Sequence, residues 1–179
     1  EWNSFMEEYF GISTQSLHLC KQPNRDDEMV SQFDKNRDPI TVSVAKQQIS
    51  KALSETNSPN FFFINMYNVH GPFNWPNDLA NPFKPSLNDA SPEILQNKYG
   101  VDWLRNSYAN AIRGADNNFS DLLDFIKNQK NGEEAIVILM SDHGVHLLEK
   151  VGKAGHGNRP FRERNQGVMS FKFGKDTDS

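Results

Sequence analysis

The chain has 179 residues, a net charge of −4 and 36% hydrophobic residues, among them 13 Phe. This length allows one domain with a real core, and the clustered aromatic residues favour a packed globule over disorder. Lys and Arg form no long basic run, so nucleic acid is not expected as a partner. No stretch reaches the roughly 18 apolar residues of a membrane span, and no signal peptide is visible. Because the chain opens on Glu1 and not on Met, we expect any membrane anchor to lie upstream of it.

The first third of the chain predicts an irregular start, then a helix and a strand. Residues 1–40 are polar and turn-prone, and we expect short irregular helices and loops there. Thr41 is a candidate N-cap, since apolar residues follow it at helical spacing. These residues are Val42, Ala45, Ile49, Ala52 and Leu53. The apolar run Phe61–Tyr67 then predicts a strand that is buried on both faces.

The remaining two thirds continue the alternation. Residues 71–92 are rich in proline and asparagine and predict a long functional surface loop. A long amphipathic helix should follow, weakened in its middle by Gly114 and ending before Asn131. Its predicted apolar face consists of Val101, Leu104, Tyr108, Ile112, Ala115, Phe119, Leu122, Leu123 and Ile126. Residues 135–140 predict a second fully buried strand, and residues 168–173 a further short one.

This order of helices and apolar strands indicates an α/β fold with a mostly parallel sheet flanked by helices. In such sheets, ligands bind beyond the carboxyl ends of the strands. Two histidine-bearing motifs, Val69-His70-Gly71 and Asp142-His143-Gly144, follow the ends of the two apolar strands. We therefore expect both motifs at the same edge of the sheet.

The adjacent Asp142 and His143 are candidate metal ligands. A carboxylate oxygen and an imidazole nitrogen together suit a divalent cation such as Zn²⁺ or Mn²⁺. Gly144 would let the backbone turn so that both side chains converge. The alternative is that Asp142 caps the next segment and His143 is an ordinary loop histidine. The position behind an apolar strand favours the metal.

His70 and His156 are candidate catalytic residues, because each is followed by a glycine. An imidazolium at such a turn can approach a tetrahedral anion and neutralise its charge, or protonate a leaving group. The alternative is that the glycines only make turns and the histidines are merely exposed. We expect His146 to be a loop residue or to support the site indirectly, and His18 to be structural.

Basic residues surround His156 and are candidates for binding the oxygens of an anion. They are Lys150, Lys153, Arg159, Arg162 and Arg164. Arginine suits bidentate contact with phosphate or sulfate. We assign substrate binding to Lys153 and Arg159, which flank the Gly155-His156-Gly157 turn, and a solvated charged loop is the alternative for the others.

Several stretches, in this order and spacing, resemble the sulfatase family of the alkaline phosphatase superfamily. They are FFFINMYNVHGPF from Phe61, YANAIRGADNNFSDLLDFIKNQ, AIVILMSDHG, and the later GHGNRPFRERNQGV. The match spans about residues 60–173.

The resemblance implies an alkaline-phosphatase-like fold, of which residues 1–179 would form a single partial domain. It implies that Asp142 and His143 bind the metal and that His70 and His156 contact the substrate anion or leaving group. It also implies hydrolysis of sulfate esters, an extracytoplasmic location, and a calcium ion. The alternatives are a phosphoethanolamine or phosphoglycerol transferase with zinc or manganese, and a non-catalytic relative that keeps the fold.

The family's nucleophile and first acidic ligands lie upstream of the matching region. Cys20 and the residues after it superficially resemble the sulfatase Cys-x-Pro-x-Arg signature, but one extra residue precedes Pro23. We therefore assign no nucleophile in this chain and interpret Cys20 as an ordinary cysteine. The chain would contribute half of an active site and be inactive alone.

Overall fold

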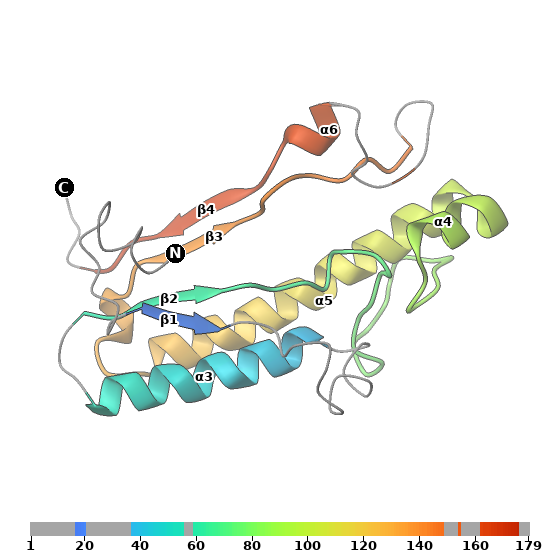
Figure 1. The fold of residues 1–179 in the computed structure, drawn as a ribbon. Coiled ribbons are helices and arrows are strands. Elements are labelled where there is room, and N and C mark those ends of the chain that lie inside the picture. Colours follow the sequence, from blue (N-terminus) through green and yellow to red (C-terminus); the bar gives the residue numbers. More distant parts are fainter. Residues whose placement is uncertain (1–16, 21–36, 56–58, 149–153, 155–161, 176–179) are drawn as a thin grey trace.

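In the computed structural model of the protein, residues 17–20, 37–55, 59–148, 154 and 162–175 are described. The first unit is a strand–helix–strand arrangement made of β1 (Leu17–Cys20), α3 (Arg37–Glu55) and β2 (Phe61–Ile64). β1 and β2 pair in parallel, with Leu17 opposite Phe61 and Cys20 opposite Ile64. α3 runs in the opposite direction along these strands (Figure 1). The parallel pair confirms the expected α/β character, whereas β1 corrects the expectation that residues 1–40 contain only irregular helices and loops.

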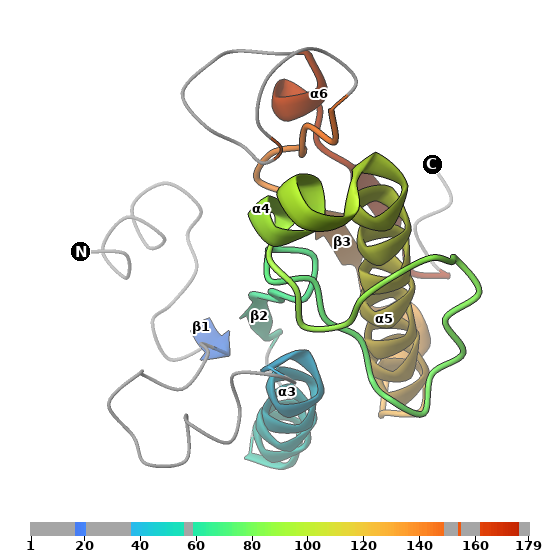
Figure 2. The ribbon, with the colours of Figure 1, turned by 90° about the vertical axis from the view of Figure 1, so that its right-hand side faces the viewer.

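β2 is half-buried and not buried on both faces, which corrects the sequence prediction. Phe62 and Ile64 pack against the core that α3 and the long helix α5 (Val101–Lys127) share. Phe61 and Phe63 point the other way and are 38% and 55% exposed. The apolar run hid this alternation because both sets of side chains are apolar, although the described helices cover only one face (Figure 2).

α3 begins five residues earlier than predicted, at Arg37 and not at Val42, so Thr41 lies inside the helix and is buried. Pro39 falls in the first turn, where its missing N–H leaves no intrahelical hydrogen bond unmade. The Asp38-Pro39 pair was therefore a helix start and not the turn signal inferred from the sequence. The core of this layer includes Val42, Ala45, Ile49 and Leu122.

The helix α5 confirms the long predicted helix, but its buried face differs from the predicted apolar one. Ile112 is 45% exposed, whereas Ser107, Asn110 and Asn118 are buried. The buried residues of α5 are Leu104, Ser107, Asn110, Ala111, Gly114, Asn118 and Leu122. The face was misplaced because the helix packs partly against a loop, whose backbone requires polar partners.

That loop covers residues 65–91 and carries a core of its own. Phe73 and Trp75 are buried and pack with Leu104 and Ala111 of α5. Phe73 also forms an isolated antiparallel bridge with Ala90. The predicted surface loop is thus anchored at its centre. It leads through α4 (Pro92–Ile94) and one π-helical turn, η2 (Leu95–Tyr99), into α5.

Gly114 permits the closest approach between this loop and α5. A Cβ atom there would lie 3.2 Å from the Trp75 Cβ atom and 3.4 Å from the Pro76 Cδ atom. The glycine that the sequence marked as a weak point of the helix is therefore a packing position.

After α5, a short 3-10 turn, η3 (Gly132–Glu134), leads into β3 (Val137–Met140). A final helical turn, α6 (Arg162–Asn165), precedes β4 (Met169–Lys172), which pairs with β3 in antiparallel fashion. Both strands were predicted, but β3 is not fully buried. Within the described residues, the β1–β2 and β3–β4 pairs form two separate two-stranded sheets, which corrects the expected mostly parallel sheet.

One side of the β3–β4 ribbon exposes six large apolar side chains, which we call the apolar ribbon face. They are Ile136, Ile138, Met140, Met169, Phe171 and Phe173, and each is between 48% and 64% exposed. The register places Ile138 opposite Phe171 and Met140 opposite Met169, so they share one side of the ribbon. No helix in the described part of the chain combines the length and apolar character that crossing a membrane requires.

Candidate active site

His70 lies in a tight turn just beyond β2. The His70 N–H donates to the Tyr67 carbonyl at 2.9 Å, and the two rings stack with centroids 4.6 Å apart. The Nδ1 atom of His70 lies 2.6 Å from the Gly71 carbonyl oxygen. His70 is an exposed residue.

Asp142 and His143 follow β3 and form a local pair. The Asp142 Oδ1 atom accepts the backbone N–H of His143 at 2.9 Å. The other carboxylate oxygen, Oδ2, lies 3.5 Å from His143 Nε2. The Asp142 side chain is 86% exposed and that of His143 39% exposed.

The two histidines share one ring arrangement. Nδ1 lies close to the carbonyl oxygen of the following glycine in both, at 2.9 Å in His143 and 2.6 Å in His70. In the tautomer with the hydrogen on Nδ1, the ring donates this hydrogen to the carbonyl and Nε2 is an acceptor. A backbone carbonyl on the other ring nitrogen is also the usual support of a metal-bound histidine.

The donor set fits a divalent cation. His143 Nε2 lies 3.5 Å from the Asp142 carboxylate, a distance at which the two groups form an ion pair when the ring is protonated and could share a cation when it is not. Nitrogen and oxygen donors are those of zinc and manganese sites. Within the described residues, no group of three or more His, Cys, Asp or Glu side chains could hold a metal, so this pair would need further ligands.

The residues on either side of this pair are tied to the chain that leads into β4. The Ser141 N–H donates to the Val168 carbonyl at 3.0 Å, and Ser141 Oγ accepts the Val168 N–H at 2.9 Å. The Gly144 N–H donates to the Arg164 carbonyl at 2.9 Å. These bonds hold Asp142 and His143 between two fixed points.

Gly144 is required by a close approach of the backbone, whereas the structure shows no sharp turn that needs a glycine at this position. A Cβ atom at this position would lie 2.2 Å from the Glu163 carbonyl oxygen and 2.4 Å from that of Gln166. Both atoms belong to the backbone around α6, so they cannot move aside cheaply.

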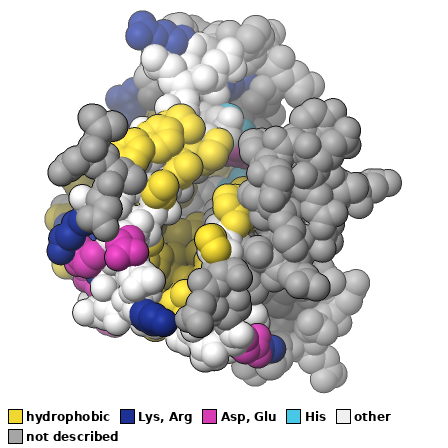
Figure 3. Space-filling view, turned by 90° about the vertical axis from the view of Figure 1, so that its left-hand side faces the viewer, with side chains coloured by type: hydrophobic (Ala, Val, Ile, Leu, Met, Phe, Trp, Pro, Cys, Tyr) yellow, Lys and Arg dark blue, Asp and Glu magenta, His cyan; other side chains and the backbone are white. Residues whose placement is uncertain are grey.

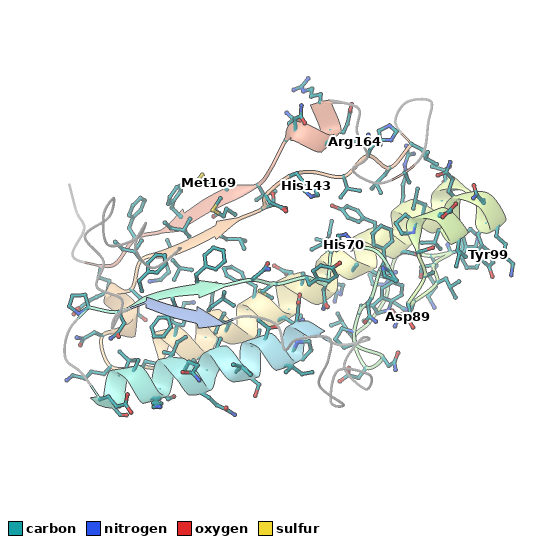
Figure 4. All side chains as sticks on the ribbon, viewed as in Figure 1. His70, Asp89, Tyr99, His143, Arg164 and Met169 are labelled. Atoms are coloured by element: carbon teal, nitrogen blue, oxygen red, sulfur yellow. The ribbon has the colours of Figure 1, made fainter. Side chains whose placement is uncertain are left out.

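The two histidine motifs converge on the same hydrophobic cluster. Phe73, three residues after His70, is in its buried centre, and Leu147, four residues after His143, packs against it. The Arg105 Nε–H donates to the Leu147 carbonyl at 3.3 Å. Figure 4 shows His70 and His143 where β2 and β3 end, on the same side of the molecule. Both motifs thus follow the ends of their strands, although these strands do not share a sheet among the described residues.

Viewed from the start of the strands, the surface between the two strand pairs is hollowed. Figure 3 shows two apolar areas separated by a hollow in which histidine atoms are visible. His146, predicted to be a loop or supporting residue, is fully buried. It follows the Asp142–His143 pair closely and helps to fix the segment that enters the cluster.

Four of the residues singled out in the sequence cannot be compared with the structure. His156, Lys153 and Arg159 lie outside the described residues, as does Lys150. Arg164 is described and is buried at 8% exposure, so it is not part of a solvated charged loop. Cys20 ends β1.

Sequence reasoning missed Asp38. Its side chain is fully buried and its carboxylate accepts the backbone N–H groups of Tyr67 at 2.6 Å and Asn68 at 2.9 Å. An acidic residue beside a proline at a helix start was the available signal, but no local pattern indicates a hydrogen bond to a backbone about 30 residues away. The buried Asn68 Nδ2 atom has no hydrogen-bond partner in the described structure.

The fold and the site together define an α/β protein with an adjacent Asp–His pair and an exposed histidine beyond the ends of its strands. The sulfatase family model matches residues 4–169, so the chain belongs to the sulfatase family, whose fold is of the alkaline-phosphatase-like α/β type. Neither a curated protein nor a solved structure gives a significant match to the chain.

Proposed function

We propose that this chain carries part of the active site of a metal-dependent enzyme that hydrolyses sulfate esters. The observation that carries the proposal is the closeness of the Asp142 carboxylate and His143 Nε2, whose atoms lie 3.5 Å apart. A cation bound there would act as a Lewis acid, polarising an ester oxygen or activating a nucleophile. Membership of the sulfatase family supports this chemistry.

Residues after the two strands would have different roles in the reaction. Asp142 and His143 would hold the metal, and His70 would offer Nε2 to the sulfuryl oxygens or the leaving group. The exposed His70 ring, held by the Gly71 carbonyl and the Tyr67 ring, supports this role. We propose that His156, Lys153 and Arg159 contact the same substrate anion. We also propose an extracytoplasmic location, on the family alone.

Transfer of a phosphoethanolamine or phosphoglycerol group is the second candidate function. It is favoured by the nitrogen donor of His143, because calcium takes oxygen ligands whereas zinc and manganese accept imidazole. The two functions therefore differ in the metal that the pair should prefer.

The test uses the full-length protein and compares it with His143→Ala. Bound metal is measured by elemental analysis, and activity is measured on an aryl sulfate and on an aryl phosphate. We expect the variant to lose at least about tenfold in metal affinity and most of the activity. Retention of both metal and activity would contradict the proposal, and a protein that binds metal but cleaves neither ester would be a non-catalytic relative.

A further inference from the structure

We propose that Asp38 is a positioning residue for His70. The inference rests on the proposed function of His70, but the contacts that carry it belong to the described structure. They connect the first turn of α3 to the turn beyond β2.

The Asp38 carboxylate uses both oxygens on the strand end. Oδ1 accepts the N–H of Tyr67 at 2.6 Å and Oδ2 accepts that of Asn68 at 2.9 Å. Two successive N–H groups form a concavity that binds an anion, and here the anion is a side chain of the protein. Since the β2 ladder ends at Ile64, these N–H groups lie beyond the strand pairing and receive their acceptor from α3.

Tyr67 transmits this position to His70 in two ways. Its carbonyl accepts the His70 N–H at 2.9 Å, and its ring stacks on the imidazole at an interplanar angle of 27°. The Asp38 carboxylate therefore fixes the backbone of Tyr67, and the carbonyl and ring of Tyr67 in turn hold His70. A shift of Tyr67 would move the imidazole with it.

Burial distinguishes Asp38 from an ordinary acidic residue in a first helical turn. Such residues usually sit at the surface and interact with their own helix. Asp38 is fully buried and reaches a different element. Asn68, which it binds, is buried as well, so water cannot replace the carboxylate without opening the core.

Asp38→Asn tests the inference, because it keeps the shape but replaces one acceptor oxygen with an NH₂ group that faces a backbone N–H. Ser107→Ala is the matched control. Ser107 is equally buried, and its Oγ accepts the Leu87 N–H at 2.9 Å, away from His70. Asp38→Ser, which is smaller and keeps one acceptor, serves if Asp38→Asn does not fold.

Three measurements are made on each variant. They are amide hydrogen exchange at Tyr67 and Asn68, the ring resonances of His70, and the steady-state constants kcat and KM. In Asp38→Asn we expect exchange at both amides to accelerate by at least about tenfold and the His70 resonances to shift. We expect kcat to fall by about 10- to 100-fold with little change in KM. Ser107→Ala should alter none of the three.

Unchanged His70 resonances and unchanged kcat in a folded Asp38→Asn protein would overturn the inference and leave Asp38 a structural residue. An unsubstituted protein that is inactive on both esters would contradict the proposed function instead. The resonances and exchange rates would still decide whether Asp38 sets the position of His70.

Discussion

The Asn110 side chain pairs with the backbone of Phe83 in both directions. Its Nδ2 donates to the Phe83 carbonyl at 2.9 Å, and its Oδ1 accepts the Phe83 N–H at 3.4 Å. Asn110 is buried in the middle of α5, where asparagine has no helical advantage. Asn110 thus provides the Phe83 backbone with the two hydrogen bonds that a neighbouring strand would provide.

Asn110→Ala should therefore destabilise the protein. The substitution leaves the Phe83 N–H and carbonyl without their partner, and we expect the free energy of unfolding to fall by about 1–3 kcal/mol. Denaturant titration measures the change. Asn117→Ala, at an exposed position of the same helix, is the control and should stay within about 0.5 kcal/mol. Equal effects of the two substitutions would show that the pairing contributes nothing.

Side chains of different size at position 114 should separate the gain in helix propensity from the loss of packing. Gly114→Ala gains about 1 kcal/mol of helix propensity but brings a Cβ atom within 3.2 Å of the Trp75 Cβ atom, so we expect a small net change. Gly114→Leu should lower the free energy of unfolding by about 1–3 kcal/mol, because it forces the loop away from α5. Thermal unfolding followed by circular dichroism measures both. A stabilised Gly114→Leu protein would show that the loop contact is not tight.

Gly144→Ala should disrupt metal binding by the Asp142–His143 pair. Its Cβ atom would clash with the Glu163 and Gln166 carbonyl oxygens, which would displace the Asp142–His143 pair. We expect Zn²⁺ affinity, measured by titration calorimetry on the full-length protein, to fall by at least about tenfold.

A second glycine provides the control for that experiment. Gly174→Ala creates a similar clash, with a Cβ atom 2.3 Å from the Glu134 carbonyl oxygen, but at the opposite end of the β3–β4 ribbon. It should lower stability and leave Zn²⁺ affinity unchanged. If Gly144→Ala bound Zn²⁺ as tightly as the unsubstituted protein, the geometry at Gly144 would not matter for the metal.

The apolar ribbon face should bind hydrophobic dyes. Exposed apolar patches of this kind promote association, so we expect the double substitution Ile138→Lys and Phe171→Lys to reduce fluorescence of the dye ANS and self-association. Ile112→Lys is the matched control, because it removes an exposed apolar residue on α5 outside this face. Unchanged dye binding in the double variant would mean that the dye binds elsewhere.

The positions of the helices and strands could be predicted from the sequence more accurately than the burial of their faces. The spacing of apolar residues located α5, and the apolar runs located β2 and β3, because periodicity and length are local properties. Exposure of Phe63 or Ile138 depends on which other segments cover the strand, and pattern does not contain that information. The same holds for the separation of β3 from the β1–β2 pair.

The site shows a similar division. Asp142, His143 and His70 stood out because adjacent donors and His-Gly pairs are visible in the sequence. Asp38 did not, because its acceptor role appears only when α3 is laid against β2. Ser107 and Asn110 were overlooked on α5 for the same reason, since their partners are backbone atoms of a distant loop.

Among the described residues, the hydrogen bonds given above for one half of the site do not involve the other half. Asp38 serves the His70 turn, whereas Val168 and Arg164 serve the Asp142–His143 pair. Losses of stability from substitutions in the two halves should consequently add, as for independent sites. Losses of rate should not add, because both halves act on one reacting group. The two halves would thus contribute independently to stability but act together in the reaction.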